Sequence, residues 1–519
     1  MPSMKSGPLF VGVDVGTGSV RAGVFDLAGA CRGAAASPIS IVQPRAGWAE
    51  QSSEEIWQAN GLAVREAVSR AAASAADVHG IAFDATCSLV VLGEGGRPLS
   101  VDIQGTSERN VIVWMDHRAT DQAERLSRSG AEALRYVGGT LSPEMEVPKL
   151  AWLRENAPAT FDTIWKVQDL ADHLVWRASG NDVRSVCTLG CKWGYLAHDG
   201  RFDDGLWKAA GIEALLEGSR TGDRVGALGE RAGSLTSAAA SHLGLSAGIA
   251  VAVGIIDAHA GGLGALGGAT PLDEQIAIIA GTSACHMAVS PQPCFVPGVW
   301  GPYHGAMVPG FWLSEGGQSA AGALLDHIVK TDARAAAFGE DPHAALASRG
   351  LQTPHDMHVL PYFHGNRSPR ADARAKGMVV GLTLDASPDA LVRLYAAATT
   401  SLAYGTRHIV ETMNAHGHRI RAVHLCGGLA KNPLYVREHA DALGLPVRVV
   451  HDPDAMLLGG AMLAATAAGA RASVAEAMSS MGAKGETVEP RTDRKALHDA
   501  RYRVFLRMYE DLLEYRGAT

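Results

Sequence analysis

Two short turns, one in each half of the chain, combine glycine with hydroxyl residues in a way that suits phosphate binding. The first contains Gly16-Thr17-Gly18 between two apolar runs, and the second contains Gly281-Thr282-Ser283. A tight turn of this kind presents consecutive backbone N–H groups in a concave nest, which attracts phosphate oxygens. Asp14 ends the run before the first turn, where its carboxylate could hold a hydrated Mg²⁺. The pair predicts a polyphosphate clamp, whereas either turn alone is better explained as a plain hairpin.

Asp257 is the candidate general base. It follows the apolar run Val251–Ile256 and precedes a glycine-rich stretch of helical character. An acid at the carboxyl end of a buried strand lies where open α/β sheets bind ligands. Such a carboxylate can accept a proton from an attacking hydroxyl, or it can cap the following helix. The sequence leaves both roles open.

Several further polar residues could hydrogen-bond a hydroxyl-rich ligand. Each follows an apolar run or stands beside glycines or an aromatic residue, and each alone is more simply a surface charge or a turn residue. As a group they offer the acids, bases and amides that a polyol needs: Asp84 before Ala85-Thr86-Cys87-Ser88, Asp116 and Arg118, Lys192 before Trp193, and Glu315 before Gly316-Gly317-Gln318.

Two other motifs are weaker candidates for a functional site. The string Gly262–Gly267 has the spacing of a dinucleotide-binding loop, but it lies too far from the preceding strand and lacks the acidic residue that should follow. Close helix packing explains its glycines better. Cys187 and Cys191 are four residues apart, with no second Cys or His pair at ligand spacing nearby, so a structural zinc site is not favoured.

The elements that must position these residues form a repeated pattern. Strand–turn–strand units are expected over 9–25 and again over 275–289, about half the chain apart. Helices are expected at 53–73, 389–414 and 497–515, strands at 78–83, 88–92, 249–256 and 422–425, and mainly helix over 103–180. The same hairpin at the start of each half predicts two related α/β domains with a cleft between them.

Composition narrows the class of protein. The chain has 519 residues, 47% of them hydrophobic, and a net charge of −8. We therefore expect several packed domains and no nucleic-acid partner, because no basic excess could neutralise phosphates. The seven scattered cysteines predict no disulfide scaffold. The same cysteine pattern favours a reducing compartment, so we expect a cytoplasmic protein. The apolar stretch Ala455–Ala470 is too short and too rich in glycine for a membrane span, so we expect no membrane partner.

These residues resemble a known family, the FGGY carbohydrate kinases of the sugar kinase/actin/heat-shock ATPase superfamily. The resemblance runs from about Leu9 to about Gly469. It rests on Asp14-x-Gly16-Thr17-x-Ser19-x-Arg21, Asp257, Gly281-Thr282-Ser283, Lys149–Asn156 and Cys426-Gly427-Gly428-Leu429-Ala430-Lys431-Asn432. Glu146 departs from the family, which more often has a small residue, a hydroxyl residue or proline there.

Within the family, the chain is most similar to the ribulokinases, especially the D-ribulokinase group. The matching segments are Phe83–Ser88, Trp114–Ala119, Cys191–Trp193, Ile256–Gly262 and Glu315–Ser319. The resemblance implies an α/β fold of two actin-like, ribonuclease H-like domains with an interdomain cleft. The expected divisions are a sugar-binding domain over 8–262, an ATP-binding domain over 263–470 and a helical tail over 471–519.

The resemblance also implies site roles. Asp257 would be the base, and the sugar would meet Asp84, Ala85, Thr86, Cys87, Asp116, Arg118, Lys192, Asp257 and Glu315. ATP would be bound by Asp14, Gly16, Thr17, Ser19, Arg21, Gly281, Thr282, Ser283, Gly317, Gln318, Gly427, Gly428 and Asn432, with Mg²⁺ held by Asp14 through water.

The expected function is ATP-dependent phosphorylation of a ketopentose at its terminal hydroxyl, with D-ribulose first. L-ribulose and D-xylulose are the alternatives within the class. A non-catalytic ATP-binding regulator of the same superfamily is the rival from another class, and a dehydrogenase built on Gly262–Gly267 comes third. The expected partners are ATP and the sugar, with a homodimer as an option.

Overall fold

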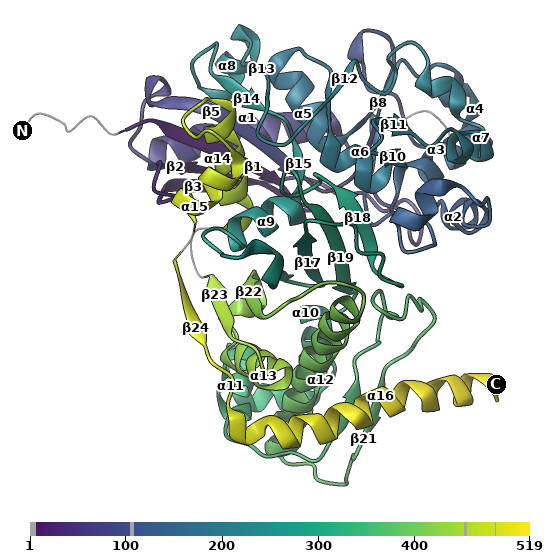
Figure 1. Ribbon diagram of the computed structural model, residues 1–519, viewed down its shortest axis with the longest axis vertical. Helices are drawn as coiled ribbons and strands as arrows, with labels where there is room; N and C mark the ends of the chain where they lie inside the picture. The colour runs from purple at the N-terminus through teal and green to yellow at the C-terminus, as the bar shows by residue number, and fades with distance from the viewer. Residues whose placement is uncertain (1–6, 104–107, 451–453, 483, 519) are drawn as a thin grey trace, which may run out of the picture.

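The computed structural model describes residues 7–103, 108–450, 454–482 and 484–518, which form two stacked lobes (Figure 1). The N-terminal half supplies most of the upper lobe of that view and the C-terminal half most of the lower one. Each lobe is built on a seven-stranded sheet covered by helices. Among the described residues, no helix is long and apolar enough to cross a membrane.

The first sheet joins an antiparallel hairpin meander to parallel strands. The meander is β1 (Leu9–Val15), β2 (Ser19–Phe25) and β3 (Cys31–Pro38). On the other side of β1 lie β5 (Val78–Ala85) and β14 (Ala250–Ala252) in parallel, with β13 (Arg231–Ser234) antiparallel at the edge and β15 (Ile255–Ile256) beside the end of β5.

The second sheet follows the same path. Its meander is β16 (Gln275–Ala280), β17 (Ala284–Ser290) and β19 (Trp312–Gln318), extended by β18 (Trp300–His304). On the other side of β16 lie β22 (Ala422–Cys426) and β23 (Val447–Val450) in parallel and β24 (Gly485–Val488) antiparallel. The repeated order of antiparallel and parallel neighbours is the duplication that the two hairpins predicted.

Helices cover the outer face of each sheet. Core residues of α1 (Ser53–Arg70), α5 (Leu170–Ser179) and α8 (Ser237–Leu243) pack on the first sheet. Those of α10 (Gly322–Thr331), α11 (Pro342–Gly350), α12 (Pro388–Ala415) and α13 (Pro433–Leu443) pack on the second.

Two helices lie in the core that joins the sheets, α9 (Asp257–Ala265) and α14 (Ala455–Ala467). They approach so closely that only glycine fits at their crossing. A Cβ on Gly264 would lie 2.1 Å from the Ala455 carbonyl oxygen, and one on Gly459 would lie 2.0 Å from the Ala260 oxygen. The glycines of 262–267 therefore serve close helix packing, which the sequence favours over a dinucleotide-binding loop.

A smaller subdomain in the upper lobe positions Lys192. Its four-stranded sheet contains β4 (Glu50–Gln51), β7 (Val111–Ile112), β6 (Leu89–Leu92) and β8 (Lys166–Asp169). Its helices are α2 (Thr120–Leu126), α3 (Glu146–Asn156), α4 (Pro158–Asp162), α6 (Val186–Lys192) and α7 (Asp204–Ala210). The region 103–180, predicted as mainly helical, thus also contributes two strands.

The remaining strands are short pairs. They are β9 (Val183–Ser185) with β12 (Arg224–Gly226), β10 (Tyr195–Leu196) with β11 (Arg201–Phe202), and β20 (His358–Leu360) with β21 (Met378–Val380). After residue 470, α15 (Val474–Met481) joins the core between the sheets and β24 joins the second sheet. The last helix, α16 (Lys495–Gly517), runs along the bottom of the lower lobe (Figure 1).

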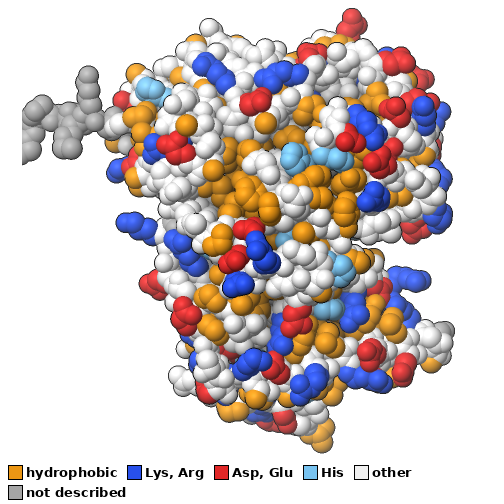
Figure 2. Space-filling view, in the orientation of Figure 1, with side chains coloured by type: hydrophobic (Ala, Val, Ile, Leu, Met, Phe, Trp, Pro, Cys, Tyr) orange, Lys and Arg blue, Asp and Glu red, His pale blue; other side chains and the backbone are white. Residues whose placement is uncertain are grey.

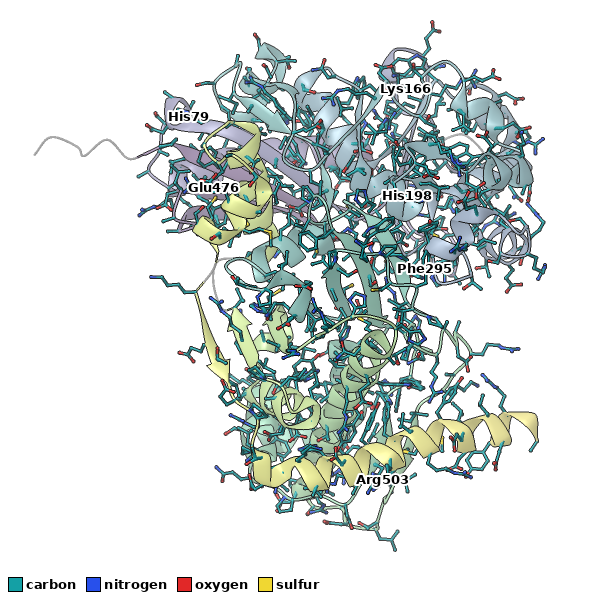
Figure 3. The ribbon with its side chains drawn as sticks, viewed as in Figure 1. His79, Lys166, His198, Phe295, Glu476 and Arg503 are labelled. Carbon is teal, nitrogen blue, oxygen red and sulfur yellow. The ribbon has the colours of Figure 1, made fainter. Side chains whose placement is uncertain are left out.

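Aromatic side chains join the lobes at one side. Tyr136 of the upper lobe hydrogen-bonds His198 at 3.0 Å and contacts Phe295 of the lower lobe with ring centroids 5.4 Å apart. Figure 3 labels His198 and Phe295 at this boundary, and Figure 2 shows hydrophobic and histidine side chains gathered at the level where the lobes meet.

Candidate functional site

Three carboxylates meet at the carboxyl ends of neighbouring strands in the first sheet. Asp14 of β1 is the register partner of Asp84 of β5, and Ile255 of β15 pairs with Asp84 on the other side. The chain then turns into α9, whose first residue is Asp257. The N-cap of α9 is Ile256, so Asp257 is not the cap that its position in the sequence also allowed. Parallel pairing therefore gathers three acids that are far apart in the sequence.

The three acids share one electrostatic environment. Burial raises the pKa of Asp257 to about 7, and the nearby Asp14 adds to the effect. Burial and the charge of Asp14 raise the pKa of Asp84 well above its usual value, and neither carboxylate oxygen of Asp84 has a hydrogen-bond partner among the described residues. Two buried carboxylates side by side, with neither oxygen of Asp84 bonded to a donor among the described residues, form the kind of oxygen-ligand set that a divalent cation prefers.

Arg21 ties these acids to the hairpin of the first sheet. It is the cross-strand partner of Asp14, and its Nε donates to the Asp14 carboxylate at 2.7 Å. It also forms an ion pair with Asp454, whose side chain caps the start of α14. In the turn, the Gly16 N–H donates to the Ser19 carbonyl at 3.0 Å.

The second hairpin is built alike. The Gly281 N–H donates to the Ser283 carbonyl at 2.8 Å, and the carbonyls of Gly281 and Thr282 accept from the N–H groups that begin α10. Thr282 is exposed. Gly427 lies beside this hairpin with φ +90°, and a Cβ there would meet the Ala280 oxygen at 2.5 Å. Glycine is therefore required where β16 and β22 end together.

A second cluster of charges lies around Trp300. Lys192 Nζ lies 4.5 Å from the Trp300 ring centroid, and the Arg367 guanidinium lies 4.0 Å from the same centroid. Arg367 donates to Glu315 Oε1 at 2.6 Å. Burial alone would raise the pKa of Glu315, but the charges of Arg367, Lys192 and His259 hold it well below its usual range. The cluster thus presents an ionised carboxylate and two cations.

Comparison with known proteins shows the family to which the two lobes belong. The model of the FGGY carbohydrate kinase N-terminal domain matches residues 9–264, and the model of the C-terminal domain matches 276–468. This chain belongs to the FGGY family of carbohydrate kinases.

Relatives of this FGGY chain span its length. A human FGGY carbohydrate kinase domain-containing protein is 46% identical over 537 residues, covering 98% of this chain and 97% of its own. A D-ribulokinase of Saccharomyces cerevisiae is 36% identical over 525 residues, covering 90% of this chain and 73% of its own. A ribulokinase of Bacillus licheniformis is 31% identical over 496 residues, covering 91% and 89%. The resemblance to sugar kinases seen in the motifs is confirmed.

Solved structures show the same fold. A xylulose kinase from Lactobacillus acidophilus superposes with a TM-score of 0.83 at 18% identity, covering 98% of this chain and 99% of its own. A second such kinase, from Brucella ovis, superposes with a TM-score of 0.82 at 22% identity, covering 98% of this chain and 100% of its own. The expected architecture of two actin-like domains is therefore confirmed.

Two residues expected at the sugar of this FGGY kinase are held in a buried network. Arg118 donates from Nε to Asp116 Oδ1 at 2.9 Å and from NH2 to Glu50 Oε1 at 2.9 Å, and it lies over the rings of Trp48 and Trp152. Asp116 also accepts from the Ala49 N–H at 2.6 Å. These contacts suit a positioning role, and direct sugar contact by this pair stays a prediction.

Some of the other predicted residues of this FGGY chain lie beside the two clusters, whereas Gln318 and Asn432 are bonded to residues of α12. Thr17 Oγ1 accepts from Trp114 Nε1 at 3.0 Å, and the Thr86 N–H donates to the Val15 carbonyl at 3.0 Å. Ala85 pairs with both Val15 and Ile256. The others are Cys87, buried within the electrostatic reach of Lys192; Gly317, packed on Arg367; Gln318, bonded to α12; Gly428, in the turn after β22; and Asn432, the N-cap of α13.

Sequence reasoning missed Arg367, Trp300 and the role of His259. His259 Nε2 lies 3.2 Å from Glu315 Oε2 and Nδ1 lies 3.0 Å from Cys187 Sγ. Burial would lower the pKa of His259, but the Cys187 thiolate and Glu315 raise it to about 10. The sequence pointed to His259 only because it stands two residues after Asp257. Arg367 lies in a loop that contains no recognisable motif, so nothing in the sequence indicated its role.

Proposed function

We propose that this FGGY chain phosphorylates a ketopentose at its terminal hydroxyl with ATP as phosphate donor, and that D-ribulose is the preferred sugar. The observation that carries the proposal is the pairing of two clusters. Asp257, a carboxylate of raised pKa, stands with Asp14 at the strand ends beside the first hairpin, and the charged group of Lys192, Arg367 and Glu315 contacts the same helix, α9, through His259. The relative named D-ribulokinase supports the choice of sugar.

In this mechanism the chain positions two substrates and moves one proton. The hairpins at Gly16 and Gly281 bind phosphate oxygens through backbone N–H groups and hydroxyls. Lys192 and Glu315 hydrogen-bond the sugar and direct its terminal hydroxyl at Asp257. Asp257 accepts the proton as the hydroxyl oxygen attacks the terminal phosphorus of ATP, and the bond from that phosphorus to the bridging oxygen breaks so that ADP leaves. Phosphoryl transfer depends mainly on such positioning and on neutralising charge.

The acid pair of the first sheet fits a magnesium ion. Asp14 and Asp84 are both buried, and the unpartnered oxygens of Asp84 gain ligands if a cation binds there, directly or through water. Mg²⁺ bound with ATP supplies positive charge that offsets the negative charge of the phosphates. The same residues without a cation place two carboxylates together with Arg21 as their main counter-charge.

A screen of acceptors tests the function directly. ADP release is measured with the full chain, ATP and Mg²⁺ over ketopentoses, aldoses and polyols, and the position of the phosphate is read by phosphorus NMR. We expect D-ribulose to show the highest kcat/KM and to yield the 5-phosphate. Xylulose, glycerol or an aldose as the best substrate would overturn the choice of sugar. ATP hydrolysis that no acceptor stimulates would instead favour a regulatory ATPase.

The second hairpin allows a focused test of nucleotide binding. Thr282→Val keeps the shape of the side chain and removes its hydroxyl, which is exposed at the turn. Losing one hydrogen bond to a charged phosphate oxygen costs about 1.5–3 kcal/mol, so ATP affinity should fall about tenfold to a hundredfold. Calorimetric titration measures it, with Thr353→Val, away from the hairpin, as the control. Unchanged ATP affinity would count against the clamp.

The raised pKa of Asp257 predicts the pH dependence of turnover. The base works only when ionised, so kcat should rise with pH through a range near 7, where burial and Asp14 place the pKa. Burial and Asp14 oppose ionisation of this group, whereas the Ala258 N–H, His259 and Arg21 favour it. The residual kcat of the Asp257→Asn variant should not show this rise with pH. A wild-type profile that is flat through neutral pH, measured with excess coupling enzymes, argues against Asp257 as the base.

A further inference from the structure

A cluster of sulfur and nitrogen ligands lies next to the sugar-facing charges. Cys187 and Cys191 are four residues apart on α6, which places both side chains on one face of the helix. His259 of α9 packs against that face. One potential ligand atom from each of the three residues lies within 4.8 Å of the other two, and all three residues are buried. The spacing in the sequence showed only the cysteine pair, and the fold adds the histidine.

The imidazole of His259 is already oriented for ligation. Its Nδ1 faces Cys187 Sγ at 3.0 Å, and its Nε2 faces Glu315 Oε2 at 3.2 Å. Glu315 is in turn held by Arg367 at 2.6 Å. A metal-bound histidine usually donates its second ring N–H to a carboxylate, which fixes the ring and makes the ligating nitrogen more basic. Glu315 occupies that position.

A buried hydroxyl lies in the same core as the two cysteines and within electrostatic reach of Cys191. The Tyr303 side chain is buried, and its hydroxyl has no hydrogen-bond partner among the residues that the structure describes. Burial and then the neighbouring Cys191 sulfur raise the pKa of Tyr303. A buried hydroxyl without a partner is costly, so a ligand that satisfies it would stabilise the site. This is an observation independent of the three sulfur and nitrogen ligands.

We propose that Cys187, Cys191 and His259 form a binding site for a borderline-soft divalent cation of the zinc class, with the Tyr303 hydroxyl or a water as fourth donor. Two thiolates and one imidazole are the ligands that Zn²⁺ selects over oxygen-seeking Mg²⁺. Two thiolates also neutralise a dication, so the bound ion adds no net charge to a buried site. The site is distinct from the acid pair proposed for Mg²⁺.

The cation would join α6 to α9 beside the reaction site. Cys191 directly precedes Lys192, and His259 stands two residues after Asp257. A metal bridge between these helices would fix the spacing between the sugar-facing lysine and the proposed base. Because the bridge is absent from the unfolded chain, its binding free energy adds to the stability of the folded state. The site does not require the proposed sugar to be correct.

The test titrates Co²⁺, a spectroscopic stand-in for Zn²⁺, into the full chain after chelator treatment and removal of any polyhistidine tag. We expect thiolate-to-cobalt charge-transfer absorption that saturates at one equivalent, is displaced by Zn²⁺ and accompanies a rise in melting temperature. Cys187→Ser and Cys191→Ser should each abolish it. His259→Asn, which keeps both sulfurs, should weaken binding at least tenfold. Cys31→Ser and Cys294→Ser, which alter an exposed and a separate buried thiol, should leave it unchanged.

Three results would overturn the proposal. The first is no charge-transfer absorption at stoichiometric Co²⁺ with the three residues intact and the protein folded. The second is absorption that persists in Cys187→Ser and Cys191→Ser. The third is absorption lost equally in Cys31→Ser or Cys294→Ser, which would indicate that thiols outside the proposed site bind the ion. Circular dichroism of each variant shows whether it is folded. If a serine variant does not fold, the effect of His259→Asn on Co²⁺ affinity tests the proposal instead, and unchanged affinity would overturn it.

Discussion

Replacing Asp257 by Asn is expected to lower kcat for sugar phosphorylation by about 10²–10⁴-fold, the usual contribution of a general base. The amide keeps the size of the side chain and can still hydrogen-bond the attacking hydroxyl, but it cannot take the proton. Because burial raises the pKa of this carboxyl to about 7, removal of its charge should not destabilise the fold. ATP affinity and melting temperature should stay close to those of the wild type.

The matched control is Asp204→Asn. Asp204 is also the first residue of a helix, α7, but it is exposed in the small subdomain. A carboxylate in the first turn of a helix contributes about 0.3–1 kcal/mol through the helix dipole, so the control reports that effect alone. Measuring kcat, ATP affinity and melting temperature on both variants separates the roles. An Asp257→Asn variant whose kcat stays within a few-fold of wild type would rule out the base.

The second large effect is expected at Lys192. Lys192→Met keeps an apolar stem of similar length over the Trp300 ring and removes the ammonium that balances Glu315. A hydrogen bond from a charged donor to the substrate contributes about 1.5–3 kcal/mol, so KM for the sugar should rise about tenfold to a hundredfold. KM for ATP should change little, because Lys192 ends α6 and lies over Trp300, and it is not part of either hairpin.

Steady-state kinetics with each substrate varied in turn measures this effect. Lys208→Met, an exposed lysine on α7, is the control for the same chemical change. Because Lys192 is buried, burial would lower its pKa, but Cys87, Glu315 and Glu144 raise it, so it is charged at neutral pH. Equal rises in KM for sugar and for ATP would show a general structural defect and contradict the assignment to the sugar.

Local patterns in the sequence were enough to predict several parts of the fold. The alternation of apolar residues around Gly16 and Gly281 predicted two hairpins, and β1–β2 and β16–β17 lie where expected. The apolar run before Asp257 predicted a strand end followed by a helix. These features depend on neighbouring residues, so side-chain periodicity and turn chemistry report them without tertiary contacts. The family motifs then indicated the two-domain architecture.

Long-range packing determines contacts between residues that the sequence motifs could not predict. Asp14 and Asp84 become neighbours only because β1 and β5 pair in parallel and in that register. Arg367 lies in a loop whose sequence has no periodic hydrophobic pattern, and it contacts Glu315 only in the folded chain. Asp116 and Arg118 are bonded mainly to each other and to Glu50 in a buried network, although the sequence presents them as free polar groups.

The sequence by itself therefore determined the hairpins, the family and the identity of the candidate base, because each of these is encoded in a short run of residues. Only the tertiary structure decided which charges face one another and how far burial moves their pKa values. It also brought His259 to Cys187, two residues far apart in the chain. The physical reason is that strand register, helix crossing and desolvation depend on segments distant in sequence, and a side chain's chemistry depends on the neighbours that those segments supply.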